Sequence, residues 1–212
     1  MDHSLEQAFQ RYQHWSGPGS TVEYTENLRQ NLPVIFDKFA IRSVLDAPCG
    51  DLVWMSLVLQ QNPSLRYTGA DIVKPLIEKH AKAYANDLRI KFLHLDITED
   101  SLPSADLWIV RDVLFHLSHS KSLSALKNFC NSNIKYILTT THGPNSKDYG
   151  GNIWTHNKDM WNGSFELLNL FAAPFNFPEP LYRLDDTHGE HPQREMCVWS
   201  QQQIAEALSK SL

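Results

Sequence analysis

The chain has 212 residues, a formal net charge of −5 at pH 7, and 42% hydrophobic against 20% charged residues. This length suits one domain with a large core, and the acidic balance without a long Lys/Arg run argues against non-specific nucleic-acid binding. Three widely spaced cysteines form neither a disulfide framework nor a CxxC zinc site. With no secretory leader and no apolar run of about 20 residues, we expect a cytoplasmic protein that does not bind membranes.

We expect a single domain over residues 1–212, in three zones. Over residues 1–40, apolar residues at helical spacing predict an N-terminal helical cap. The loop Ser16–Ser20 interrupts this cap, and Pro33 is expected to kink or restart its second helix. Residues 41–140 form the predicted core, and residues 141–212 supply long loops and the last strands. The predicted strands are 41–46, 66–71, 90–96, 107–110, 136–140, 181–184 and 195–199, and the predicted helices after residue 40 are 53–60, one that begins near Pro75, one around 123–130, and 201–208.

The alternation of strands and helices predicts the fold class. Strands separated by helices favour right-handed βαβ crossovers and a sheet covered by helices on both faces. We therefore predict an α/β, Rossmann-like, doubly wound sheet that is mostly parallel, with N-terminal helices. The last two strands are expected to form a hairpin-like edge with an antiparallel strand.

Acidic residues lie at the ends of three successive predicted strands, at Asp46, Asp71 and Asp96. Ligands of doubly wound sheets bind at the carboxyl ends of the strands. Asp71 is placed to accept hydrogen bonds from both ribose hydroxyls of an adenosine, and Asp96 with Ile97 to bind the adenine. The turn that follows Asp46 lacks the G-x-G-x-x-G pattern that seats a pyrophosphate, so it suits a ligand without phosphates. A plain turn, or a turn cap at Asp96, is the alternative explanation.

The same residues resemble a known family. Val44–Gly50 is similar to the first motif of class I S-adenosylmethionine-dependent methyltransferases, Asp71 and Asp96 match the acidic positions of the second and third motifs, and Ile109–Leu117 is similar to the fourth. The first motif departs from the common G-x-G form. The resemblance covers residues 41–140 and implies S-adenosylmethionine as cofactor, with methyl transfer in line to an oxygen or nitrogen of a small-molecule acceptor. The segment Trp15–Ser20 also resembles a small bacterial and fungal group of enzymes with small-molecule acceptors.

The Ser16–Ser20 loop is expected to form a nest of backbone donors for the carboxylate of the cofactor's methionine moiety, and a linker between helices is the alternative. Trp15 and Arg29 would line that part of the pocket, and Cys49 is expected to be a small lining residue without nucleophilic activity. The complete predicted cofactor set is Trp15, Ser16, Gly17, Ser20, Arg29, Asp46, Ala47, Cys49, Gly50, Asp71, Ile72, Asp96, Ile97 and Arg111.

A base near the ends of the fourth and fifth strands would remove the acceptor's proton. The predicted catalytic residues are Asp112 and His142 as candidate bases, with His116 as an orienting group. Arg111 is expected either to orient these groups or to pair with an anionic group on the acceptor.

Residues 141–212, the C-terminal tail, supply the predicted residues of the acceptor side of the pocket. The candidate residues are Asn152, Trp154 and His188, and the loop of His188 and His191 is placed to reach the same mouth. Most tail aromatics, a group that includes Phe165, are expected to form a satellite core, and an apolar wall for the acceptor is the alternative. His142, His188 and Asp112 have side chains that can bind a metal, but their spacing is not compact, and we predict no metal site.

Three rival functions remain open at this point: an RNA or protein methyltransferase, a nicotinamide oxidoreductase, and a non-catalytic subunit that binds S-adenosylmethionine. The acidic charge opposes an RNA substrate, and the missing glycine fingerprint opposes a nicotinamide cofactor. The expected partner is a small molecule and no nucleic acid, and the chain is expected to be a monomer or a homodimer.

Overall fold

The structure is a computed structural model that describes residues 16–210. The predicted first helix, with its apolar stripe from Leu5 to Trp15, lies outside these residues. The described strands are β1 (Ser43–Asp46), β2 (Arg66–Asp71), β3 (Ile90–His94), β4 (Leu107–Val110), β5 (Tyr136–His142), β6 (Tyr182–Asp185) and β7 (Arg194–Ser200). The described helices are α2 (Glu26–Lys38), α3 (Met55–Gln61), α4 (Lys74–Ala83), α5 (His119–Cys130) and α6 (Gln201–Ser209), with 3-10 turns η2 (Pro18–Ser20) and η3 (Leu114–His116).

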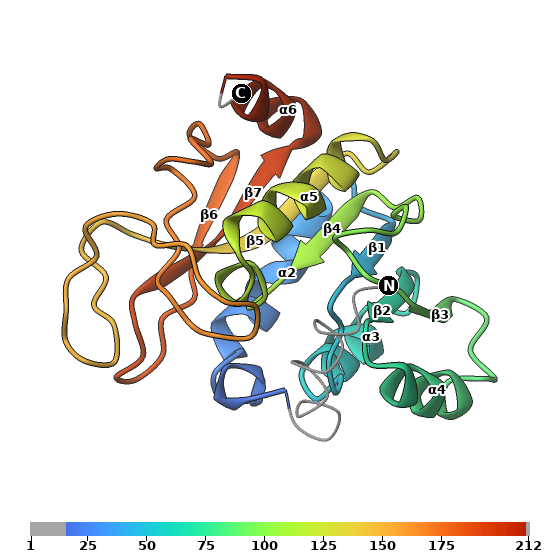
Figure 1. The fold of residues 1–212 in the computed structure, drawn as a ribbon. Helices are drawn as coiled ribbons and strands as arrows, with labels where there is room; N and C mark the ends of the chain where they lie inside the picture. The colour runs from blue at the N-terminus through green and yellow to red at the C-terminus, as the bar shows by residue number, and fades with distance from the viewer. Residues whose placement is uncertain (1–15, 211–212) are drawn as a thin grey trace.

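A seven-stranded sheet runs through the molecule in the order β3-β2-β1-β4-β5-β7-β6 (Figure 1). The first five of these strands are parallel, whereas β7 is antiparallel to both β5 and β6. This confirms the predicted Rossmann-like sheet and its hairpin-like edge, in which β7 is the antiparallel strand and β6 the outermost one. The strand order reverses between β1 and β4, where a doubly wound sheet places its ligand.

Two hydrophobic layers cover the sheet. Side chains of α2 and α3, such as Leu32 and Met55, pack on one face, while Phe129 of α5 and Ile204 of α6 pack on the other. Figure 1 shows α5 in front of the sheet and α2 behind it. Burial of these apolar stripes on both faces explains why the pattern of amphipathic helices in the sequence predicted the layers correctly.

Two details differ from the prediction. Helix α2 continues through Pro33, so the expected restart is absent and the expected kink stays a prediction; burial of Leu32, Ile35 and Phe36 against the sheet offsets the one hydrogen bond that a proline removes. Strand β3 ends at His94, two residues before Asp96. The Asp96 carboxylate accepts the Thr98 N–H at 2.8 Å, so a turn begins where the strand was expected to continue.

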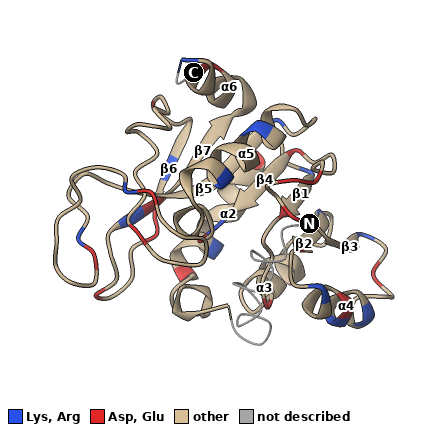
Figure 2. Cartoon of the chain, in the orientation of Figure 1, with Lys and Arg blue, Asp and Glu red and all other residues tan. Residues whose placement is uncertain are grey.

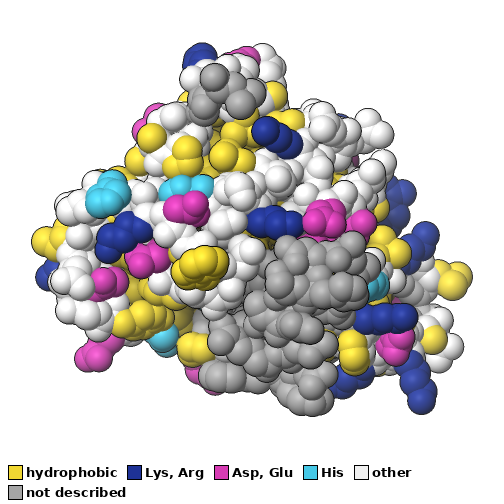
Figure 3. All heavy atoms as spheres, viewed as in Figure 1, with side chains coloured by type: hydrophobic (Ala, Val, Ile, Leu, Met, Phe, Trp, Pro, Cys, Tyr) yellow, Lys and Arg dark blue, Asp and Glu magenta, His cyan; other side chains and the backbone are white. Residues whose placement is uncertain are grey.

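Residues 143–181 form a long segment without helix or strand apart from an isolated bridge between Lys147 and Ile153. Figure 1 shows these gold and orange loops extending beyond the β5–β7–β6 side of the sheet. On the face drawn in Figure 3, hydrophobic side chains occur in small groups among polar and charged ones. Within residues 16–210, none of the helices has both the length and the apolar character needed to cross a bilayer.

Candidate active site

A cavity of 320 Å³ opens at the carboxyl ends of the parallel strands, where β1, β2 and β4 lie side by side. It brings together most of the predicted site residues. Those that line it are Ser16, Gly17, Ser20, Asp46, Cys49, Gly50, Asp71, Ile72, Asp96, Ile97, Arg111, Asp112 and His116.

The turn after β1 depends on Gly50. Its φ is +55°, and a Cβ at this position would collide with the Oγ of Ser16. Ser16 and Asp51 are joined reciprocally, since the Ser16 N–H donates to Asp51 Oδ2 at 2.9 Å and the Asp51 N–H donates to Ser16 Oγ at 2.8 Å. The glycine is therefore required both for its left-handed backbone and for the close approach of the segment that begins at Ser16.

Asp46 ends β1 in a buried position, with 2% of its surface exposed. The Tyr67 hydroxyl donates to its Oδ2 at 2.7 Å. Burial raises the pKa of the Asp46 carboxyl to about 7, while the Tyr67 hydrogen bond lowers it. The carboxyl is thus close to its titration midpoint at neutral pH.

Asp71 and Asp96 follow in register on the next two strands. Asp71 accepts the N–H of Gly50 at 3.1 Å and the N–H of Val73 at 3.0 Å, so it fixes the β1 turn, and burial raises the pKa of its carboxyl. The Oδ1 of Asp96 accepts from Thr98, but its buried Oδ2 has no hydrogen-bond partner among the described residues. A buried oxygen without a donor costs free energy, and a ligand donor entering beside it would recover that cost.

The Ser16–Ser20 segment lines the cavity as a 3-10 turn. The Ser20 N–H donates to Gly17 O at 3.1 Å and the Thr21 N–H donates to Pro18 O at 3.4 Å. These two donors are used within the turn, and the role of the loop's other N–H groups toward the cofactor's carboxylate stays a prediction. The segment packs against the β4 end, since Arg111 Nη1 donates to Gly19 O at 2.6 Å.

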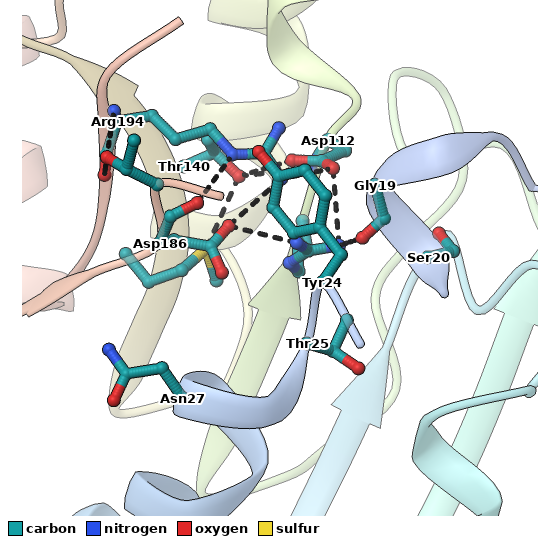
Figure 4. A network of polar contacts seen from close by, with 12 residues as sticks. Gly19, Ser20, Tyr24, Thr25, Asn27, Asp112, Thr140, Asp186 and Arg194 are labelled. Atoms are coloured by element: carbon teal, nitrogen blue, oxygen red, sulfur yellow. Dashed lines mark hydrogen bonds and ion pairs between the residues drawn. The ribbon is translucent and has the colours of Figure 1, made fainter. Parts of the chain in front are cut away.

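Two arginines and two aspartates form a buried network beside the cavity (Figure 4). Arg111 contacts Asp186 at 2.9 Å and Asp112 at 3.2 Å. Arg194 contacts Asp112 at 3.0 Å and Asp186 at 3.1 Å. The Tyr24 ring lies against both guanidinium groups, 4.5 Å from Arg194 Cζ and 5.5 Å from Arg111 Cζ. Gly19 borders the network so closely that a Cβ there would lie 2.6 Å from Asp112 Oδ2.

Asp112 is held at both carboxylate oxygens. The Thr140 hydroxyl donates to Oδ1 at 3.0 Å, and both arginines pair with Oδ2. Burial alone would raise the pKa of the Asp112 carboxyl, but the guanidinium groups of Arg111 and Arg194 bring it below the usual range. A carboxylate that is stabilised in its charged form is a poor proton acceptor. Asp112 is therefore better suited to orient the two arginines than to act as the base. Its φ of +58° places it in the left-handed region.

His142 lies beneath the cavity and does not line it. Its side chain is 1% exposed, and its Nδ1 accepts the Leu168 N–H at 3.1 Å. Burial lowers the pKa of His142 to about 4. The prediction of His142 as a base at the strand end is therefore corrected, because the β5 ladder continues to residue 142 and packs the ring under Phe115, 5.3 Å away between centroids.

His116 does line the cavity, at the end of η3. Its Nδ1 lies 2.5 Å from the carbonyl oxygen of Ser164, so Nδ1 carries the proton and donates it. The neutral ring then has its lone pair on Nε2, which is the nitrogen able to accept a proton.

Several predicted site residues lie away from the cavity. Arg29 donates to Val22 O, in the turn that precedes α2, at 2.9 Å. Asn152 donates to Asp148, and Trp154 Nε1 donates to Asn157, so both side chains stabilise the loop. His188 stacks on the outer side of Tyr24 at 5.1 Å. Ala47 is fully buried, with its carbonyl accepting from Trp108 Nε1, and Trp15 lies outside the described residues.

Other lining residues were missed by the sequence analysis. Tyr24, Tyr149 and Arg194 line the cavity and were not predicted. His191 and Phe165 also line it; the sequence placed His191 in a loop near the mouth and Phe165 among the tail aromatics. A signal existed for Arg194 alone: β7 is antiparallel, so its first residue lies at the same edge as the carboxyl ends of the parallel strands. The others come from loops whose paths no local pattern predicts.

No protein-family model matches the chain, and no curated protein matches it in sequence. Solved structures do match. The N-methyltransferase NodS from Bradyrhizobium japonicum WM9, in complex with S-adenosyl-L-homocysteine, is 13% identical with a TM-score of 0.63, covering 92% of this chain and 97% of that one. Magnesium protoporphyrin IX methyltransferase from Synechocystis PCC 6803, with bound SAM, is 11% identical with a TM-score of 0.54, covering 93% of both chains.

Human N-acetylserotonin methyltransferase, in complex with SAM, is 15% identical with a TM-score of 0.57, and the match covers 93% of this chain but 59% of the human one. At these identities the likeness concerns the fold. The strand order, the antiparallel β7 and the cavity at the strand ends agree with it. The chain therefore has the Rossmann-like fold of class I S-adenosylmethionine-dependent methyltransferases.

Proposed function

We propose that this protein is an S-adenosylmethionine-dependent methyltransferase that transfers a methyl group to a small-molecule acceptor. The observation that carries the proposal is the convergence of Asp46, Asp71 and Asp96 on one cavity in a fold of this class. The missing phosphate-binding glycines agree with a ligand that carries an adenosine but no phosphates.

The residues present fit the cofactor. The unpartnered Asp96 Oδ2 offers an acceptor to the adenine amino group, beside the apolar side chain of Ile97. Asp71 lines the cavity, and a carboxylate with about four lone-pair sites can accept from ribose hydroxyls beside its bonds from the Gly50 and Val73 N–H groups. Gly50 lets the Ser16 segment approach the β1 turn closely, so that both lie along the cavity where the methionine moiety would be bound.

When bound, the cofactor supplies an electrophilic methyl carbon on a sulfonium; the acceptor atom bonds that carbon as the carbon–sulfur bond breaks, and the electron pair remains on sulfur. The chain's own task is to orient the acceptor, exclude water and remove one proton. Nε2 of His116 takes this proton in the proposal, because the Ser164 carbonyl fixes Nδ1 as the protonated nitrogen. Asp112 and Arg194 hold the neighbouring wall in place.

The charge distribution supports a small molecule over a nucleic acid. Figure 2 shows blue and red positions interspersed along the described chain, with no element that is basic throughout. An RNA or DNA ligand would need a continuous basic face for its phosphates.

Calorimetric titration tests the proposal. S-adenosylmethionine and S-adenosylhomocysteine are expected to bind, whereas NAD is not. Asp71→Ala is expected to weaken the binding of S-adenosylhomocysteine by about tenfold to a hundredfold, since it removes hydrogen bonds to a charged acceptor worth about 1.5–3 kcal/mol. Preference for NAD would reject the proposal, and cofactor binding without transfer to any offered acceptor would favour a non-catalytic subunit.

A further inference from the structure

Six aromatic and imidazole rings follow one another along one wall of the cavity. Consecutive centroids lie 5.1, 5.9, 5.2, 5.4 and 4.6 Å apart. All six side chains line the cavity that also contains the strand-end carboxylates. In order along the wall they are Tyr24, His191, Tyr149, Phe165, Phe115 and His116.

These rings come from separate parts of the chain that only the tertiary structure brings together. Tyr24 precedes α2, Phe115 and His116 belong to η3, and the other three come from loops after β5 and before β7. The hydroxyl of Tyr149 and Nδ1 of His191 are 3.0 Å apart, which joins the two loops across the mouth. The continuous row of rings is therefore formed by the tertiary structure of the cavity and not by a single helix or strand.

The charged groups beside this wall are paired with one another. Arg111 uses both terminal nitrogens on Asp186, Asp112 and Gly19 O. Arg194 is ion-paired with the same two carboxylates. In the described part of this wall, an anionic acceptor group would thus find both guanidinium groups already ion-paired, and an ammonium group would find Asp112 and Asp186 already paired with them. Both arguments favour an uncharged acceptor.

The size of the cavity limits the acceptor further. Its volume of 320 Å³ is near the lower end of the range of about 300–1,000 Å³ for ligand sites. Cofactor and acceptor share this space, so the acceptor is small. A flat ring makes the largest contact with edge-to-face and tilted aromatic neighbours in a narrow space.

Resting on the proposed methyl transfer, we infer that the acceptor is an uncharged, planar aromatic molecule that carries a hydroxyl group. Phe115 and Phe165 contact its ring, and the hydroxyl lies toward His116, which receives the hydroxyl proton. Phe115 and Phe165 are then specificity residues, and neither takes part in the chemical step.

A series of matched probes tests this inference on the full-length protein saturated with S-adenosylhomocysteine. The probes are naphthol, its saturated counterpart decahydronaphthol, the anion naphthoate and the cation naphthylmethylammonium, each titrated by calorimetry. Naphthol is expected to bind at least about tenfold more tightly than each of the other three. Equal or tighter binding of the saturated or either charged probe would overturn the inference.

Phe165→Leu removes the ring while it keeps an apolar side chain. It is expected to weaken naphthol binding about fivefold, the equivalent of the roughly 1 kcal/mol of an aromatic pair, and to leave decahydronaphthol binding unchanged. Phe171→Leu is the matched control, because Phe171 is also half-buried but lies outside the cavity, over Arg183. Equal losses in the two variants would also contradict the inference.

Two further measurements separate the possible failures. If Phe165→Leu unfolds early in a thermal melt, Tyr149→Leu repeats the test at a ring that is 67% exposed. If S-adenosylhomocysteine does not bind, the proposed function fails, and the same probe titrations without it still measure the ring preference of the wall. Binding of S-adenosylhomocysteine without a preference for naphthol rejects the acceptor class alone.

Discussion

The two sides of the cavity are built in different ways. On the side of β1, β2 and β3, carboxylates at strand ends are held by backbone donors of neighbouring turns, as Asp71 is by Gly50 and Val73. On the other side, rings from a 3-10 turn and two long loops contact each other through their side chains, as Phe165 and Tyr149 do. The first side is fixed by the sheet, and the second by loops packed on it.

This difference indicates where substitutions change cofactor affinity and turnover independently. Sites on strands are held by the ladder of the whole sheet, whereas sites on loops can change contacts without disturbing that ladder. The comparison thus predicts that the strand-end side governs cofactor affinity and that the ring side governs turnover and acceptor choice. Variants on one side should leave the measured property of the other side unchanged.

The largest effect is expected from His116→Ala on the ring side. Loss of a general base lowers turnover by about a hundredfold to ten thousandfold, while the dissociation constant of S-adenosylhomocysteine stays within twofold. Steady-state kinetics measures the turnover, and calorimetry measures the dissociation constant. Added imidazole is expected to restore part of the turnover, since it replaces the missing proton acceptor.

His119→Ala is the control for this variant. His119 is also half-buried, but its ring packs on Phe175, 5.7 Å away, and it does not line the cavity. The turnover of the His119→Ala variant is expected to stay near that of the unmodified protein. A similar loss in both variants, or a His116→Ala protein that imidazole leaves inactive, would assign His116 a structural role.

A second contrast concerns stability against pH. The pKa of His142, beneath the ring side, is lowered by burial to about 4 from 6.5. Above pH 6.5 the ring is neutral in both states; as the pH falls toward 4, the unfolded chain binds a proton that the native chain does not. Stability is therefore lost on acidification, by about 3 kcal/mol at 1.36 kcal/mol per pKa unit.

Asp46, on the strand-end side, makes folding stability depend on pH in the opposite direction. Its pKa is raised by burial to about 7 from 3.8, so the native state keeps a proton that the unfolded state loses, and stability falls as the pH rises from 4 to 7. Denaturant unfolding at several pH values tests both groups. His142→Gln should make stability fall more steeply with rising pH, and Asp46→Asn should make it rise more steeply; the same slope in both would refute the assignment.

The same division explains what the sequence could predict. The sheet, its edge and the carboxylates at 46, 71 and 96 follow from periodicity and from the rule that ligands bind at strand ends, and each is a local property. Tyr149, Phe165 and His191 depend on the path of residues 143–193, over which no regular pattern constrains the backbone. The position of His142 depends on where β5 ends. The strand continues to residue 142 and not only to 140, so the residue lies within the sheet and its side chain packs into the core.

A smaller effect is expected at the turn after β1. Gly50→Ala requires a left-handed alanine, at about 1–2 kcal/mol, and its Cβ would displace Ser16. We expect the affinity for S-adenosylhomocysteine to fall about tenfold. Turnover with saturating cofactor should change far less, because His116 and the ring wall are untouched.

Gly143→Ala supplies the comparison for this change. A Cβ at Gly143 meets only Ser146 Oγ at 3.9 Å, which is an ordinary contact, and the residue does not line the cavity. Calorimetry should give unchanged cofactor affinity. If both alanines weaken binding equally, the close approach of Ser16 to Gly50 is not what shapes the strand-end side.

The smallest effect is expected from Arg29→Gln, although a cation near the Ser16–Ser20 loop is the residue that sequence reasoning selects for a carboxylate. The guanidinium of Arg29 donates to Val22 O and Thr25 Oγ1, both in the turn before α2, and Arg29 does not line the cavity. Surface changes of this kind usually alter stability by less than about 0.5 kcal/mol, so cofactor affinity should stay within twofold. A tenfold or greater loss of cofactor affinity would mean that α2 moves when the cofactor binds. The cofactor side of the cavity would then include α2 in addition to the strand ends.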